Sequence, residues 1–308
     1  MAFIDELTQA GLLISTGEKG LYGKNQVFES IVSALDENIT RLGVDQNAEV
    51  MRFPPAMTFT DFKASGYMGT LPQLAGTVHC FCGNEREHKQ LLKCIAENDD
   101  SWTDKQQVSN LVITPAACYP VYPVVARRGV LPEKGVVVDA ASYCFRHEPS
   151  IDPMRMQFFR MHEYIKIGTP NQILSFRDEW IHRGKAFISM LDLPLSIDVA
   201  NDPFFGRGGV IMANSQREQQ LKYELLIPVD DPLKPSACMS FNYHMDHFGE
   251  LWNIKTSNGA LAHTACVGFG MERITLALLK HHGFDIKQWP DNVLFALWPS
   301  KAKMLAFA

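Results

Sequence analysis

The chain has 308 residues, of which 46% are hydrophobic, so it is long enough to bury a substantial core. Its 29 Lys and Arg residues and 34 Asp and Glu residues leave a formal net charge of -5. This charge disfavours autonomous binding of RNA, because a local basic patch would have to act against the overall field. The sequence has neither a membrane-spanning apolar stretch nor a secretory pattern at its N-terminus. We therefore expect a soluble, cytoplasmic protein with one principal domain.

The first predicted elements are a helix, a short strand and a long hairpin. Over residues 27–42 the apolar residues recur at three- and four-residue steps, which indicates a helix packed on one face. EVMRFPPAM follows as a short strand that Pro54 and Pro55 end. The extended runs VVVDAASYCFRHE and MQFFRMHEYIKIG are joined by a turn-prone segment, so residues 136–168 predict an antiparallel hairpin with a long loop.

The second half of the chain continues with alternating helices and strands. SFRDEWIHRGKAFISMLDL has the apolar face of a helix, and KYELLIPV and ACMSFNY are typical of strands. GFGMERITLALLKHHG predicts the end of a strand and a glycine turn that opens into a helix closed by Gly283. Without repeats or linkers, this pattern favours one continuous α+β domain around an antiparallel sheet.

The predicted hairpin carries an unusual density of charge. FRHE lies on its first strand, Arg155 in its loop and RMHEY on its return strand. Charges on a central sheet need partners, because desolvating an unpaired charge costs several kcal/mol. A structural network of ion pairs is one interpretation. A site for a triphosphate is the other, since arginine forks suit phosphate oxygens.

These motifs resemble the three motifs of class II aminoacyl-tRNA synthetases, and most closely those of the seryl branch. FRHE, a loop and RMHEYIKIG, within residues 143–168, resemble motif 2, and GFGMER with its apolar helix, within residues 266–283, resembles motif 3. Residues 27–56, a helix that leads to FPPAM, are similar to motif 1, the dimer-forming element. The resemblance implies a class II synthetase-like antiparallel sheet flanked by helices, and a homodimer.

Carried over by residue, the resemblance implies a nucleotide site. Arg146 would hold the α-phosphate, Glu148 would read the adenine amino group, and Arg273 would clamp the far phosphates. Mg²⁺ would accompany ATP, although Ala237 stands where the family has a carboxylate. The other nucleotide-binding positions that it implies are Arg155, Met156, Arg160, Lys222, Ala237, Cys238 and Met239.

Cys118, Glu163 and Cys266 form a candidate metal centre. Two thiolates and a carboxylate suit Zn²⁺ and leave a fourth position open, although two core cysteines and an ion-paired glutamate would give the same sequence. Zinc-dependent archaeal-type seryl enzymes use such a set to bind the substrate amino group, so the resemblance implies one Zn²⁺ per subunit. Strand alternation places Glu163 and Arg160 on opposite faces, and we therefore expect a bulge or a strong twist there.

Other potential ligands receive no role. The seven cysteines include no CxxC pair, which indicates mostly reduced thiols. Cys80 and Cys82 form a CxC without a second pair, so we interpret them as core or loop residues. An isolated histidine is more often structural than metal-binding. We accordingly assign no ligand among His147, His162, His244, His247 and His263.

Few residues precede the motif 1 helix, and no anticodon-type domain follows motif 3. This architecture resembles the truncated seryl-synthetase homologues known as amino acid:carrier protein ligases, which transfer an aminoacyl group to the phosphopantetheine thiol of a carrier protein. The resemblance implies activation of a small amino acid, glycine or alanine with serine left open, a phosphopantetheinylated carrier as partner, and no stable binding of tRNA. A minimal tRNA synthetase with a separate RNA-binding partner and a non-catalytic sensor of amino acid or ATP are the alternatives.

A basic helix is a candidate dock for the carrier, which is usually acidic. An ordinary solvated helix face is the alternative interpretation. The basic residues in question are Arg177, Arg183 and Lys185, with Arg207 and Arg217 beyond them.

Overall fold

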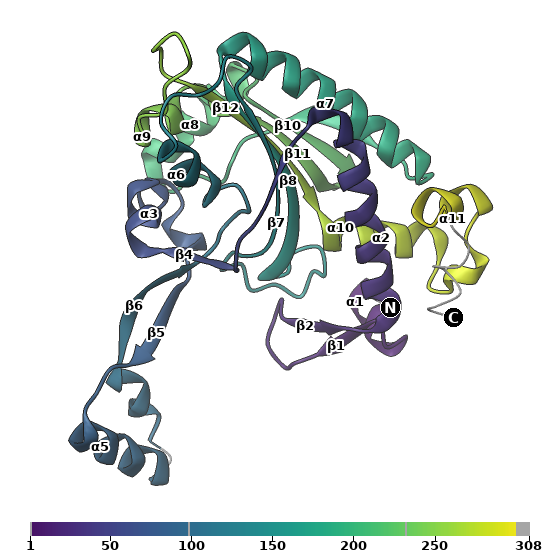
Figure 1. Ribbon diagram of the computed structural model, residues 1–308. Helices are drawn as coiled ribbons and strands as arrows, with labels where there is room; N and C mark the ends of the chain where they lie inside the picture. The colour runs from purple at the N-terminus through teal and green to yellow at the C-terminus, as the bar shows by residue number, and fades with distance from the viewer. Residues whose placement is uncertain (1, 98, 232, 300–308) are drawn as a thin grey trace.

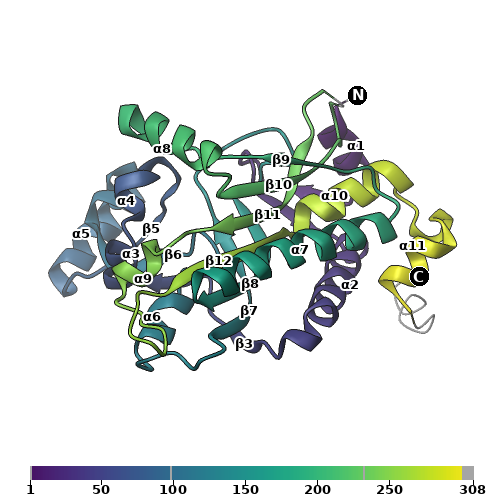
Figure 2. The same cartoon turned by 90° about the horizontal axis from the view of Figure 1, so that it is seen from above.

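The computed structural model describes residues 2–97, 99–231 and 233–299. Its main feature is a seven-stranded sheet in the order β3-β7-β8-β12-β11-β10-β9 (Figures 1 and 2). β3 is parallel to β7, and every other neighbouring pair is antiparallel. The strands of this sheet are β3 (Glu49–Arg52), β7 (Val136–Phe145), β8 (Phe158–Gly168), β9 (Ser196–Val199), β10 (Lys222–Ile227), β11 (Ser236–Tyr243) and β12 (His263–Gly270).

Helices cover both faces of this sheet. Buried side chains of α2, α7 and α10 form the larger core cluster on one face, and those of α6 and α9 pack on the other. No helix in the described ranges combines the length and the apolarity that crossing a membrane requires. The α-helices are α1 (Phe3–Gln9), α2 (Gln26–Leu42), α3 (Phe59–Ala64), α4 (Tyr67–Thr70), α5 (Glu85–Ala96), α6 (Val121–Ala126), α7 (Pro170–Met190), α8 (Gly206–Glu218), α9 (His247–Leu251), α10 (Met271–His282) and α11 (Asp291–Leu297).

The elements predicted for the main sheet and its helices are confirmed, and their ends have local causes. The side chain of Asn25 accepts a hydrogen bond from the backbone N–H of Phe28, which caps α2. Thr169 and Gln172 form a capping box at the start of α7. α10 begins after Gly270 and ends before Gly283, whose φ of 90° favours glycine.

β8 is a regular strand, and its alternation decides what reaches each face. Its register with β7 and β12 runs without a shift. His162 and Tyr164 point toward α2, where they contact Asp36 and the carbonyls of Ile39 and Thr40. Glu163 points to the opposite face, so the bulge or strong twist predicted from the sequence is wrong.

A projecting arm was not predicted. It is built on the sheet β4-β6-β5 and carries α5 at its far end (Figure 1). No residue in the ranges 75–97 and 99–111 is buried. Cys80 and Cys82 lie on this arm and are exposed, which places them outside any core. The remaining strands are β1 (Leu13–Ser15), β2 (Tyr22–Lys24), β4 (Ala56–Thr58), β5 (Thr77–Phe81) and β6 (Gln106–Ile113).

Candidate active site and metal centre

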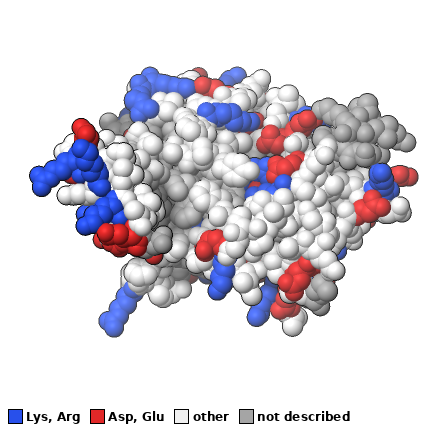
Figure 3. All heavy atoms as spheres, turned by 90° about the horizontal axis from the view of Figure 1, so that it is seen from below, with Lys and Arg blue, Asp and Glu red and all other residues white. Residues whose placement is uncertain are grey.

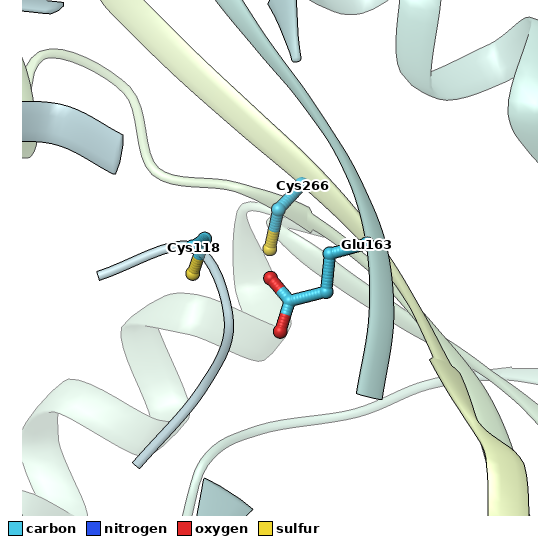
Figure 4. A group of neighbouring side chains, drawn as sticks. All are labelled: Cys118, Glu163 and Cys266. Atoms are coloured by element: carbon cyan, nitrogen blue, oxygen red, sulfur yellow. The ribbon is translucent and has the colours of Figure 1, made fainter. Parts of the chain in front are cut away.

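The three predicted metal ligands converge. Cys118 lies just before α6, Glu163 on β8 and Cys266 on the adjacent strand β12, and their side chains point toward one another (Figure 4). One potential ligand atom from each lies within 4.8 Å of the others, and all three residues are buried. The strand pairing explains this convergence, because Glu163 and Cys266 occupy the same face of neighbouring strands.

The electrostatics of this triplet suit a cation. Glu163 accepts a hydrogen bond from the backbone N–H of Ala117 through Oε1, at 3.0 Å, whereas its buried Oε2 has no hydrogen-bond partner in the described part of the chain. Burial, and then the charge of Cys266, raise the pKa of Glu163 to about 8. Contact with the Cys266 sulfur, together with burial, raises the pKa of Cys118. Three acidic groups in one dry site ionise together only beside a positive charge, and this donor set fits Zn²⁺.

Two polar side chains support Cys266 from β11 and the segment after it. Asn242 Nδ2 lies 3.3 Å from the Cys266 sulfur, and His244 Nε2 lies 3.6 Å from it. The other ring nitrogen of His244 lies 3.0 Å from the hydroxyl of Thr264, which orients the imidazole. Such outer contacts fix the orientation of metal ligands. Sequence reasoning gave neither residue a role.

A cavity of about 630 Å³ connects this triplet to the predicted nucleotide residues. That volume lies within the usual range for ligand sites. Arg155 is absent from the lining and instead forms an exposed ion pair with Glu148, at 3.5 Å. The predicted nucleotide residues that line the cavity are Arg146, Glu148, Met156, Lys222, Ala237, Cys238, Met239 and Arg273.

Two arginines in this cavity carry positive charge without a carboxylate partner in the described residues. Arg146 donates from Nε to the carbonyl of Pro115, at 3.3 Å. Arg273 donates to the carbonyls of Met154 and Ala237, at 2.7 and 2.8 Å. These carbonyls hold the guanidinium groups in place without neutralising them. Both cations are therefore available to an anionic ligand.

The structure adds cavity residues that the sequence analysis missed. Phe159 lines the cavity, and the guanidinium carbon of Arg146 lies 5.3 Å from the centre of its ring. A planar base fits such an aromatic and guanidinium pair. Phe159 has the same strand parity as Glu163, so alternation along β8 contained this signal. Asp202 and Glu224 also line the cavity and pair with Lys222, at 2.6 and 3.1 Å.

Arg160 requires a correction, because the structure does not bring it into the cavity. It lies on the face of β8 covered by α2 and α10, where it forms a bidentate pair with Glu29, at 2.6 and 2.9 Å. Its Nε and backbone N–H also donate to Glu272, at 2.8 and 2.6 Å. Both carboxylates satisfy its guanidinium, so Arg160 joins the motif 1, 2 and 3 elements and is absent from the cavity lining.

Replacing Arg160 by Gln should lower the free energy of unfolding by about 3 kcal/mol, measured by urea denaturation. The reason is Glu272, which is only 2% exposed and, among the described residues, would keep only Lys24, 3.6 Å away, as an ion-pair partner. Arg128→Gln is the matched control, since Arg128 forms a bidentate pair with Glu49 at the surface. That control should cost less than about 1 kcal/mol. Equal losses in the two variants would contradict this assignment.

Comparisons with known proteins bear on this site. No model of a protein family matches the chain. A Bradyrhizobium diazoefficiens protein named amino acid–acyl-carrier-protein ligase 1 is 45% identical over 282 residues, which cover 92% of this chain and 86% of that protein. The chain belongs to the amino acid–acyl-carrier-protein ligases. A second ligase of that name and organism, numbered 2, is 43% identical over 94% of this chain and 86% of its own length.

More distant relatives of this ligase confirm the class II synthetase fold. A type-2 serine–tRNA ligase of Methanopyrus kandleri is 26% identical over 63% of this chain but only 39% of its own length. The crystal structure of the M. kandleri seryl-tRNA synthetase in complex with tRNA superposes with a TM-score of 0.82, at 20% identity. That match covers 96% of this chain and 60% of the synthetase. The α+β class II fold predicted from the sequence is therefore confirmed.

Proposed function

We propose that this ligase activates a small amino acid with ATP as an aminoacyl-adenylate and transfers it to the phosphopantetheine thiol of a carrier protein. The observation that carries the proposal is that one cavity contains the Cys118, Glu163 and Cys266 triplet together with Arg146 and Arg273, two arginines without a carboxylate partner in the described part of the chain. One part suits phosphates, and the other suits a cation that can hold an amine. The names of the relatives, which specify amino acid and acyl-carrier protein, support the same reaction.

In the first step the carboxylate of the amino acid attacks the α-phosphate of ATP, and pyrophosphate leaves. Arg146 and Arg273 stabilise the negative charge that develops, because their guanidinium groups are already fixed by backbone carbonyls. Zn²⁺, when bound by the triplet, supplies a Lewis acid that holds the substrate amine. Glu224 and Glu272 line the cavity on the elements that carry Lys222 and Arg273, and we propose them as neighbours of the Mg²⁺ that accompanies ATP.

Packing beside the triplet supports a small substrate. Gly268 lies opposite Glu163 in the strand register, and a Cβ atom there would lie 2.9 Å from Met161 Cε and 3.2 Å from Ser240 Oγ. The wall next to the amine site is therefore already filled. Because one methylene changes binding by only about 1–3 kcal/mol, glycine, alanine and serine have to be compared directly.

The test is ATP–pyrophosphate exchange with each of the twenty amino acids, repeated on zinc-stripped protein. We expect exchange with glycine, alanine or serine alone, lost without the metal and restored by Zn²⁺. If the activated amino acid is then transferred to tRNA in the presence of cell extract, and is not transferred to a carrier protein, the protein would be a minimal tRNA synthetase. Binding of ATP and amino acid without exchange would favour a sensor.

The face of this ligase shown in Figure 3 agrees with a protein partner better than with RNA. It is largely uncharged, and its Lys and Arg side chains lie near Asp and Glu side chains without a broad basic area. The homodimer predicted from motif 1 stays part of the proposal, and β3 is an edge strand of the sheet in that region. Sedimentation equilibrium would test the dimer.

The structure changes which basic residues fit a carrier dock. Arg177 stacks on Tyr223 and pairs with Asp178, and Arg183 pairs with Asp45, so neither charge is free. Arg207 and Arg217, by contrast, are exposed on α8, the helix that borders the cavity. We therefore propose α8 as the docking element.

Reversing both charges, Arg207→Glu with Arg217→Glu, should raise the KM for an acidic carrier by at least tenfold. Charges at the rim of an interface speed the encounter of two proteins through their electrostatic field. Because salt screens this field, the rise in KM should become smaller as salt is added. Pyrophosphate exchange should keep its rate, because neither residue lines the cavity. Arg86→Glu with Lys89→Glu on α5 is the matched control. An equal rise in KM in the control variant would argue against α8.

A further inference from the structure

The transfer step of the proposed function needs an acceptor thiol to lose its proton. The thiolate is the nucleophile, and a thiol of ordinary pKa near 8.5 is ionised only to a few per cent at pH 7. Arg146 and Arg273 are cations, and the triplet is committed to the amine. The cavity carboxylates Asp202, Glu224 and Glu272 are already paired with Lys222 or Arg160. A neutral base within the cavity would meet this need.

His247 is placed for that task. It is the first residue of α9, lines the cavity and is exposed, so an entering thiol can reach it. Its ring centre lies 4.9 Å from that of Phe248. The ring of Phe248 in turn stacks on that of Tyr122, with 4.2 Å between the ring centres. Its ring centre lies 5.8 Å from that of Tyr119, the residue after Cys118. One aromatic ring therefore separates His247 from the residues beside the metal ligands.

His247 also differs from its neighbours in having a free imidazole. Among the described residues, no hydrogen bond or ion pair occupies its ring nitrogens. His244 is held by Thr264 and Cys266, His263 lies 2.5 Å from the Tyr243 hydroxyl, and His162 is held by Asp36. These other histidines are fixed by the fold, whereas His247 remains available to a ligand.

Burial and the neighbouring His244 favour the neutral form of His247. Partial burial against the cavity wall, and then the neighbouring His244, lower the pKa of His247 below its usual value. Glu250 and Asp246, on and beside the same helix, oppose that shift more weakly. The imidazole is therefore uncharged near pH 7 and able to accept a proton.

We propose that His247 is the general base of the transfer step, which rests on the proposed function. The thiol sulfur forms a bond to the carbonyl carbon of the adenylate while its proton moves to the His247 imidazole. The bond between that carbon and the phosphate oxygen breaks, and AMP leaves with the electron pair. The imidazolium then returns its proton to water. No oxidant, reductant or covalent enzyme intermediate takes part.

The test separates the two half-reactions in His247→Gln and His247→Ala. Preformed aminoacyl-adenylate on the enzyme is mixed with free pantetheine or with phosphopantetheinylated carrier in single turnover, and pyrophosphate exchange is measured on the same preparations. General base catalysis contributes roughly 10²–10⁴-fold. We expect transfer to both acceptors to fall at least thirtyfold more than exchange. His79→Gln, at an exposed position on the arm, should change neither.

Further readouts distinguish a base from a docking or structural residue. Wild-type transfer should rise with pH through the pKa of His247 and then level off, whereas the variants should follow the ionisation of the thiol. Added imidazole should restore part of the transfer in His247→Ala. A loss limited to the carrier, with pantetheine unaffected, would overturn the proposal in favour of docking. Proportional loss of transfer and exchange would also overturn it, while absence of wild-type exchange would instead defeat the proposed function.

Discussion

Replacing Cys266 by Ser should lower amino-acid-dependent pyrophosphate exchange by at least roughly a hundredfold and reduce bound zinc from about one per chain to nearly none. Cys266 is a buried thiol that contacts Cys118 and Glu163. Among the described residues, no other cysteine, histidine or carboxylate joins Cys118 and Glu163 in such a group of potential metal ligands. A serine hydroxyl ionises far less readily than a thiol and is a poor zinc ligand. Zinc content by atomic absorption and exchange with glycine or alanine are the measurements.

The control for non-specific metal binding is Cys80→Ser, because that thiol is exposed on the arm. It should keep both zinc and exchange. If Cys266→Ser retains wild-type zinc and exchange, the triplet is not the metal centre, and the interpretation as two core cysteines with a buried glutamate is the correct one.

The same centre makes the zinc-free protein sensitive to pH. The pKa of Glu163 is about 8 in the folded chain against 4.5 as its ordinary value, so folding favours the protonated carboxyl. Its stabilising contribution is complete below pH 4.5 and is lost as pH rises through about 8, by roughly 5 kcal/mol at most. Zinc should remove this loss, and Glu163→Gln should flatten it. Urea denaturation at several pH values, with and without zinc, gives the comparison.

Sequence reasoning identified the parts of the site that depend on strand parity and motif order. Glu163 and Cys266 meet because they lie on one face of neighbouring strands. Strand alternation places Arg160 on the face opposite to Glu163, whereas the motif resemblance implies that Arg160 contacts the nucleotide. A bulge in β8 would have been needed for both to hold. The regular register of β8 shows that parity was the better guide, and it would also have found Phe159.

Other features depend on contacts that the sequence does not display. Asp202 follows β9 and acquires its role only because Gln216 and Lys222 hold it beside the cavity, at 2.9 and 2.6 Å. The arm has no buried residue in the ranges 75–97 and 99–111, so hydrophobic periodicity gave no signal for it. His247 is one of several histidines in the sequence, and its place in the lining of the cavity follows only from the three-dimensional structure.

Replacing Arg146 or Arg273 by Gln should mainly lower activity, whereas replacing Arg160 by Gln should mainly lower stability. Arg146→Gln and Arg273→Gln should each lower pyrophosphate exchange by about 10²–10³-fold, since each removes a positioned donor that faces the developing charge. Neither arginine has a carboxylate partner among the described residues, and so neither loss leaves a buried anion behind. The free energy of unfolding should change by about 1 kcal/mol or less, the cost of hydrogen bonds to carbonyls.

The decisive measurement is the melting temperature of these variants with and without ATP and Mg²⁺. The wild type should gain stability from the nucleotide by mass action, whereas Arg146→Gln and Arg273→Gln should lose most of that gain. Arg160→Gln should instead melt lower in both conditions and keep its nucleotide-dependent gain, because its charge is neutralised by Glu29 and Glu272. A large loss of stability in Arg146→Gln without ATP would mean that its charge serves the fold, as in a structural ion-pair network. A buried positive charge without an anionic partner in the protein lowers stability. Such a charge is retained at a functional site because the bound ligand provides the anion.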